Sequence, residues 1–204
     1  MRVGVLASGT GTNLQAILDR VHGRHGVEVV AVASDKANAP ALQRAAHVGV
    51  ATGTFPLTGE RAERDAAIAD FLAEHDTELV VLAGYMALLT PGFLQRFPNR
   101  VINVHPALLP AFPGLRAIEQ ALAYGVKVFG VTIHLVDEGV DSGPIILQRA
   151  LELPEATDAA AVHAALRPLE HDLLPRAVRL LAAGAVRRDP QNPRRLVVGA
   201  ATPT

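Results

Sequence analysis

The stretch RVGVLASGTGTNLQAILDRV, residues 2–21, joins a strand pattern to a helical pattern through a loop rich in glycine. Residues 2–7 are mostly apolar without alternation, which is typical of a strand buried on both faces of a parallel sheet. Similar strand runs follow at 27–34, 49–55, 78–84 and 100–105, and helical patterns at 12–21, 39–49 and 59–75 lie between the first four strands. Strands and helices in alternation predict an α/β fold with a doubly wound, mainly parallel, Rossmann-like sheet.

The pattern changes after residue 125. The patterns of residues 127–136 and 143–153 are typical of two long strands separated by a short acidic loop. Two such strands predict an antiparallel C-terminal extension. Residues 157–184 predict one long helix, bent or interrupted near Pro168 and Pro175. We expect a single domain over 1–204, with halves at 1–100 and 101–186 and a loosely held, Arg/Pro-rich tail at 187–204.

The composition excludes several classes of protein. Of 204 residues, 50% are hydrophobic, which is enough for a sizeable core, and the net charge of −1 gives no broad attraction for a nucleic acid. The chain has no cysteine, so disulfides, thiolate catalysis and Cys-based zinc sites are excluded. No apolar run approaches the roughly 18 residues of a membrane span, and the N-terminus does not resemble a signal peptide. We therefore expect a cytoplasmic protein without nucleic-acid or membrane partners.

The loop SGTGTN, residues 8–13, lies where a parallel sheet binds its ligands, at the carboxyl end of a strand. Gly9 and Gly11 permit a sharp turn, and the following helix N-terminus offers N–H groups to an anion. One interpretation is a phosphate bound at Gly11, Thr12 and Asn13. The other is a plain strand-to-helix turn with Thr12 or Asn13 as the N-cap.

A second group of polar residues begins in VINVHPALLPAFPG, residues 101–114. Asn103 and His105 lie two apart on a strand, so they share a face, and three prolines stiffen the loop that follows. An imidazole beside an amide and a carboxylate, here Asp141, can stabilise an oxyanion and move a proton. Taken singly, a histidine at a strand end is usually structural, and we expect His134 to be a half-buried strand residue. No pair of histidines has metal-ligand spacing.

Four segments carry a family resemblance. VLASGTGTNLQA, VVLAGYMALLTPGF, INVHPALLPAFPG and GVTIHLVDEGVDSGPIILQ resemble the phosphoribosylglycinamide formyltransferase branch of the folate-dependent formyltransferases, in matching order from residue 2 to about 184. HP-x-LLP and D-x-G-P are shared by the wider family, and SG-x-G-x-N narrows the match to this branch. The resemblance implies transfer of the formyl group of 10-formyltetrahydrofolate to 5'-phosphoribosylglycinamide in purine biosynthesis, without a metal, in a monomer or homodimer acting on small molecules.

The resemblance also implies site residues. Asn103, His105 and Asp141 are implied as the catalytic trio. Residues implied to bind the ribonucleotide are Gly11, Thr12, Asn13 and Glu170; those implied to bind the folate are Arg61, Met86, Ala87, Leu88, Leu89, Asn103, Asp137, Glu138, Gly139, Val140 and Asp141. The chain departs from the family pattern with Ala107 in place of Ser and Ala87 in place of Arg, and no role is assigned to Arg116. In this reading the first half binds the nucleotide phosphate, and the second half carries catalysis and folate binding.

Other functions fit parts of the same pattern. A methionyl-tRNA formyltransferase shares HP-x-LLP but carries an additional C-terminal RNA-binding domain. A formyltetrahydrofolate hydrolase normally carries an additional N-terminal regulatory domain. A nucleotide-binding regulatory protein would use the sheet and glycine loop without needing the trio. A NAD oxidoreductase fits least well, because Leu14 stands where the third glycine of the dinucleotide fingerprint belongs.

Overall fold

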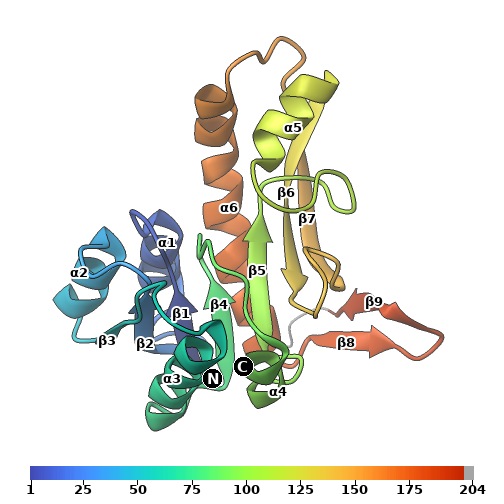
Figure 1. Ribbon diagram of the computed structural model, residues 1–204. Coiled ribbons are helices and arrows are strands. Elements are labelled where there is room, and N and C mark those ends of the chain that lie inside the picture. Colours follow the sequence, from blue (N-terminus) through green and yellow to red (C-terminus); the bar gives the residue numbers. More distant parts are fainter. Residues whose placement is uncertain (200–204) are drawn as a thin grey trace. The chain divides into compact units, whose positions relative to one another are not determined.

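The computed structural model describes residues 1–199 (Figure 1). The chain forms two compact units, Met1–Asn103 and Val104–Thr204, the second described to residue 199. Strand β5 (Val101–His105) begins in the first unit and ends in the second.

The first unit is a parallel sheet with helices between its strands. The strands are β1 (Arg2–Leu6), β2 (Glu28–Ser34), β3 (Ala51–Thr54), β4 (Leu79–Leu82) and the start of β5, paired in the order β3-β2-β1-β4-β5. Strand β1 lies at the centre, where Val5 pairs with Val32 of β2 and with Val81 of β4. All four residues of β4 are buried, as the continuous apolar run predicts, whereas β3 alternates because it forms an edge.

The helices of the first unit are α1 (Thr12–Arg20), α2 (Pro40–His47), α3 (Arg61–Glu74) and α4 (Pro91–Arg96). Helix α1 contacts α2, and α3 contacts α4, as the blue and green ribbons of Figure 1 show. Helix α4 was not predicted from the sequence; it begins with Pro91 at its first turn and is capped by Thr90, whose Oγ1 accepts from Phe93 N at 3.4 Å.

The second unit contains the antiparallel pair β6 (Val128–Leu135) and β7 (Ile145–Glu152). Helix α6 (Ala159–Ala182) packs on both strands and contacts α5 (Ala117–Tyr124). It continues through Pro168 and Pro175 as a single helical element. The predicted parallel α/β fold with an antiparallel C-terminal extension is confirmed by the strand pairings of the two units.

Two predictions for the second unit were wrong. The segment from Arg187, predicted as a loose tail, forms most of an antiparallel hairpin of β8 (Val186–Asp189) and β9 (Asn192–Val198). Strand β9 contacts β7, so this hairpin is tied to the rest of the unit, while residues 200–204 of the predicted tail lie outside the described residues. His134, predicted to be half-buried, is almost fully buried at 1% exposure.

Candidate active site

Asp141 lies between the buried imidazoles of His105 and His134, and these three residues form an acid–base cluster in the second unit. Asp141 Oδ2 lies 3.2 Å from His105 Nδ1, and its Oδ1 lies 3.4 Å from His134 Nε2. The opposite ring nitrogens also face oxygen: His105 Nε2 lies 2.8 Å from Phe112 O, and His134 Nδ1 lies 2.8 Å from Leu135 O. Because an imidazolium donates from both nitrogens, either ring can hold a proton here with both N–H groups bonded. The cluster can therefore store and move a proton.

Asp141 is held as a carboxylate. Burial by itself raises the pKa of this group, but hydrogen bonds from His134 and from the Gly114 N–H, together with the nearby imidazoles, lower it further than burial raises it. The net pKa lies below the ordinary aspartate value. Gly114 N donates to Asp141 Oδ2 at 2.8 Å, which links the acidic loop to the end of the proline loop.

The proline loop after β5 is fixed by two polar side chains. Thr132 Oγ1 on β6 donates to Ala107 O at 2.7 Å and accepts from Leu109 N at 3.1 Å. Gln148 on β7 donates to Leu109 O at 2.8 Å. The sequence predicted a stiff loop from its prolines; the structure adds these backbone bonds. Ala107 uses only its carbonyl, so the departure from the family's serine leaves this bond intact.

The strand β5 also carries Asn103, half-buried at the last position of the first unit and two residues before His105. Side chains two apart on a strand point to one face, so the predicted amide and imidazole share a side of β5. Glu170, predicted to bind the ribonucleotide, is buried on α6 at 5% exposure. Their roles stay predictions.

The acidic loop between β6 and β7 holds the other predicted folate residues of the second unit. Asp137 Oδ1 accepts from Ser142 Oγ at 2.6 Å and from Gly139 N at 3.2 Å, while Val140 is exposed. Gly143 closes this loop: a Cβ there would lie 1.8 Å from Leu135 O, so no larger residue fits without moving the backbone. The close turn at Gly143 ends the loop, in which Asp141 lies beside the imidazoles.

In the first unit, the glycine loop leads into α1 as predicted, and neither Thr12 nor Asn13, the N-caps of the alternative interpretation, caps the helix. The N-cap is Gly11, in the left-handed region with φ 71°, and no side chain caps the helix. Thr12 and Asn13 therefore lie in the first turn and not at the cap, where backbone N–H groups of a helix point outward. A Cβ on Gly11 would lie 2.7 Å from Ala41 Cα, so glycine is needed here for packing against α2. The geometry fits an anion site, and phosphate binding stays a prediction.

The predicted folate stretch of the first unit, Met86–Leu89, is a loop with exposed apolar side chains. Met86 and Leu88 are 61% and 60% exposed. The structure brings Arg61, on α3, to this stretch, since its Nη2 donates to Leu89 O at 3.3 Å. These residues are assembled within the unit, as the prediction requires.

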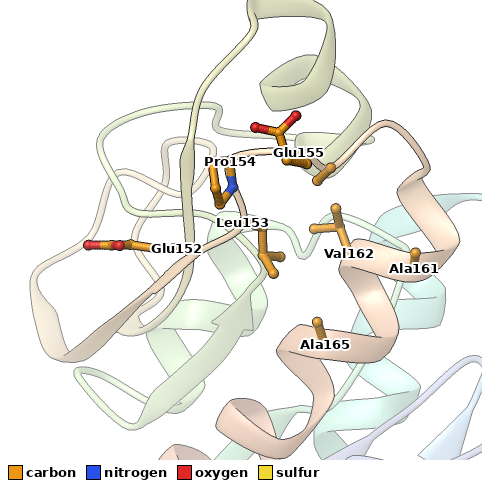
Figure 2. Close-up of a pocket in the computed structure, with 8 residues that line it drawn as sticks. Glu152, Leu153, Pro154, Glu155, Ala161, Val162 and Ala165 are labelled. Atoms are coloured by element: carbon orange, nitrogen blue, oxygen red, sulfur yellow. The ribbon is translucent and has the colours of Figure 1, made fainter.

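An apolar pocket of about 300 Å³ lies elsewhere in the second unit, between the end of β7 and the start of α6. Figure 2 shows Leu153, Val162 and Ala165 around the pocket, while Glu152 points away from it. No predicted site residue lines it, and its ionisable groups are the carboxylates of Glu152 and Glu155, without a histidine. Within residues 1–199, no group of three or more His, Asp or Glu is placed to hold a metal, and no helix is long and apolar enough to cross a membrane.

The roles of two buried polar residues were not predicted from the sequence. His134 stood out only as a polar residue in the apolar run TIHLV; a buried imidazole needs partners, and one of them is Asp141. Asp65 occupies the first position of the apolar stripe of α3, ahead of Ile68, Ala69 and Leu72, and is fully buried. The sequence signal for Asp65 is a carboxylate at a helix position where the spacing predicts an apolar residue.

An α/β fold with a buried imidazole–carboxylate cluster beside a strand end defines a protein equipped for acid–base group transfer. Comparison with known proteins gives the family: residues 1–178 match the family described as formyl transferase, and the chain belongs to that family.

Named relatives agree with this assignment. The chain is 44% identical over 187 residues to a phosphoribosylglycinamide formyltransferase of Mycobacterium tuberculosis, covering 91% of this chain and 86% of the relative. A protein of the same name from Bacillus subtilis is 39% identical, with 88% and 94% covered. The crystal structure of a glycinamide ribonucleotide transformylase 1 from Symbiobacterium toebii superposes with a TM-score of 0.92 at 45% identity, covering 98% of this chain and 94% of that one.

Proposed function

We propose that this chain transfers the formyl group of 10-formyltetrahydrofolate to the amine of 5'-phosphoribosylglycinamide. The products are tetrahydrofolate and 5'-phosphoribosyl-N-formylglycinamide, and the reaction belongs to purine biosynthesis. The observation that carries the proposal is the 44% identity over 91% of the chain to a relative of that name. The buried His105–Asp141 pair supports the chemistry, because formyl transfer needs a stabilised oxyanion and a moving proton.

The proposed reaction proceeds through a tetrahedral intermediate. The neutral amine attacks the formyl carbon, a C–N bond forms, and negative charge develops on the formyl oxygen. Asn103 donates an amide N–H to that oxygen, and His105 in its protonated form supports the same charge. The bond from the carbon to N10 of the folate then breaks, while the amine's proton passes to N10 through Asp141 or a water molecule. His134 holds the far oxygen of Asp141 and keeps it facing His105.

We propose two binding sites for the substrates. Gly11, Thr12 and Asn13 hold the ribonucleotide phosphate at the N-terminus of α1, with Glu170 contacting the same substrate. Arg61, Met86–Leu89, Asn103 and Asp137–Asp141 hold the folate. The family match runs without a break across the boundary between the two units, which supports their acting as a single formyltransferase domain. The enzyme is proposed to work in the cytoplasm as a monomer or homodimer, on small molecules and without a metal.

The test is an assay of the purified chain with both substrates, following loss of 10-formyltetrahydrofolate and formation of the formylated ribonucleotide by mass spectrometry. Formyl transfer that depends on the ribonucleotide supports the proposal. Hydrolysis to formate without an acceptor, or transfer to methionyl-tRNA in place of the ribonucleotide, would overturn it. A His105→Ala variant is the control for a contaminating enzyme.

A further inference from the structure

The backbone of the proposed folate stretch is held at both ends by buried polar side chains of its own unit. At the first end, Ser8, 3% exposed, accepts from Met86 N through Oγ at 3.1 Å and donates from its backbone N to Gly84 O at 3.1 Å. At the other end, Asp65, 0% exposed, accepts from Thr90 N through Oδ2 at 2.7 Å. The segment between these two anchors is the one proposed to bind the folate.

A single peptide group at the second anchor is held from both sides. The Leu89 carbonyl accepts from Arg61, and the Thr90 N–H of the same peptide group donates to Asp65. Arg61 and Asp65 lie four apart on α3, so they share one face of the helix. Two neighbouring side chains of a rigid helix therefore set the orientation of one peptide plane in the loop.

The carboxylate of Asp65 is itself fixed. Arg64 donates to Asp65 Oδ1 from Nε at 3.1 Å and from Nη2 at 2.7 Å, and the Arg64 side chain is only 10% exposed. Both guanidinium bonds go to Oδ1, which leaves Oδ2 for Thr90. A charged acceptor in a buried setting makes a stronger hydrogen bond than a neutral one in water, so this anchor holds the loop more firmly than an ordinary turn bond.

We infer that Asp65 is a positioning residue for the folate: held by Arg64, it sets the conformation of residues 86–89 by accepting the Thr90 N–H. The inference rests on the proposed function, since it takes the folate to bind at these residues. The family resemblance implies that the folate contacts residues 86–89 largely through their backbone groups. A binding site made of backbone groups depends on a preset loop conformation. Loss of the anchor makes the ligand order the loop on binding, which weakens affinity.

The decisive comparison uses two double variants that both lack the buried ion pair. Arg64→Ala with Asp65→Ala removes the acceptor for Thr90 N. Arg64→Ala with Asp65→Asn keeps an oxygen acceptor for Thr90 N. Because the Arg64 guanidinium is removed as well, the NH₂ group of the new asparagine does not face another donor. Because neither leaves an unpaired buried charge, folding is less at risk than in a single variant. Asp70→Ala with Arg96→Ala, which removes an exposed ion pair between α3 and α4 at 2.9 Å, is the matched control.

The measurements are the dissociation constant of tetrahydrofolate by equilibrium dialysis, the two KM values, kcat and the thermal midpoint. We expect the Ala/Ala variant to bind tetrahydrofolate about tenfold or more weakly, the scale of one charged hydrogen bond, with the KM of the ribonucleotide and kcat within about threefold. The Asp70 control should bind as wild type does, and the Ala/Asn variant, which keeps a neutral acceptor, should bind more tightly than the Ala/Ala variant.

Equal weakening in the Ala/Ala and Ala/Asn variants would overturn the inference, because the ion pair and not the Thr90 bond would then matter. Wild-type affinity in the Ala/Ala variant, with only a lower thermal midpoint, would also overturn it and leave Asp65 a purely structural residue. Failure of the proposed function gives a different result: the wild-type chain binds tetrahydrofolate but transfers no formyl group. A wild-type chain that does not bind tetrahydrofolate at all would overturn both.

Discussion

Replacement of Asp141 by asparagine tests the acid–base cluster with little change of shape. Asp141 has φ 50°, in the left-handed region, and asparagine tolerates that region as well as aspartate does. The new carbonyl oxygen can still accept from Gly114 N, at 2.8 Å in the native chain. The new amide nitrogen then takes the place of Oδ1 and faces His134 Nε2, from which it can accept no hydrogen bond. The substitution therefore removes the charge and one acceptor and leaves the loop in place.

The expected effect follows from the bonds that are lost. One charge-assisted hydrogen bond contributes about 1.5–3 kcal/mol, which at 1.36 kcal/mol per factor of ten corresponds to a loss of about 10- to 150-fold. Loss of a group that moves a proton costs about 10²- to 10⁴-fold. Since one carboxylate serves both purposes, the two factors do not simply multiply. We expect kcat to fall by about 10²- to 10⁴-fold.

The assay is steady-state formyl transfer with each substrate varied in turn. We expect the KM of the ribonucleotide to change by less than about fivefold, because the main loss belongs to the chemical step. Urea unfolding at pH 7 should show a cooperative transition for the variant, which separates lost chemistry from lost folding. A folded Asp141→Asn enzyme with kcat within threefold of wild type would refute the role of this carboxylate in proton movement.

Three further predictions concern stability and binding. The folded pKa of Asp141 lies below its ordinary value, so its ionisation stabilises the native state fully above about pH 4 and loses this effect as the pH falls through the folded pKa. The difference in unfolding free energy between wild type and Asp141→Asn, measured by urea titration, should therefore shrink from pH 6 to pH 3. A constant difference would contradict the ionisation argument. Glycinamide riboside should react with a kcat/KM about 10²- to 10⁴-fold below that of the ribonucleotide if two charged hydrogen bonds at the α1 N-terminus hold the phosphate, whereas equal values would remove the phosphate site. Gly11→Ala should destabilise the fold by about 1–3 kcal/mol, because its Cβ meets Ala41 Cα at 2.7 Å and φ is 71°, while Gly9→Ala, with no atom within 4 Å of the added Cβ, should unfold like wild type in thermal melts.

The sequence was sufficient for the parallel half of the fold because burial on both faces leaves a direct mark on a strand. Residues 79–82 are buried throughout and read as a continuous apolar run, and the helices between strands repeat apolar residues at helical spacing. Helix α5 was missed: it has only eight residues, and its N-cap Arg116, at φ 59°, makes no side-chain capping bond. The β8–β9 hairpin was missed because Arg and Pro suggested an extended tail, although the strand pairing is made by backbone groups.

The order of residues along β5 was sufficient to predict that Asn103 and His105 share a face, because alternation of side chains is a local property of any strand. The pairing of His134 with Asp141 was decided by the tertiary structure alone. A register shift between Ile133 and His134 and the tight turn at Gly143 together place the acidic loop, and neither is visible as a spacing in the sequence. The same holds for Asp65, since the hydrogen bond between a helix side chain and a loop 25 residues later exists only when both are packed together. Local geometry follows from the order of residues along the chain. The partners of buried charges are determined by the packing that removes those charges from water.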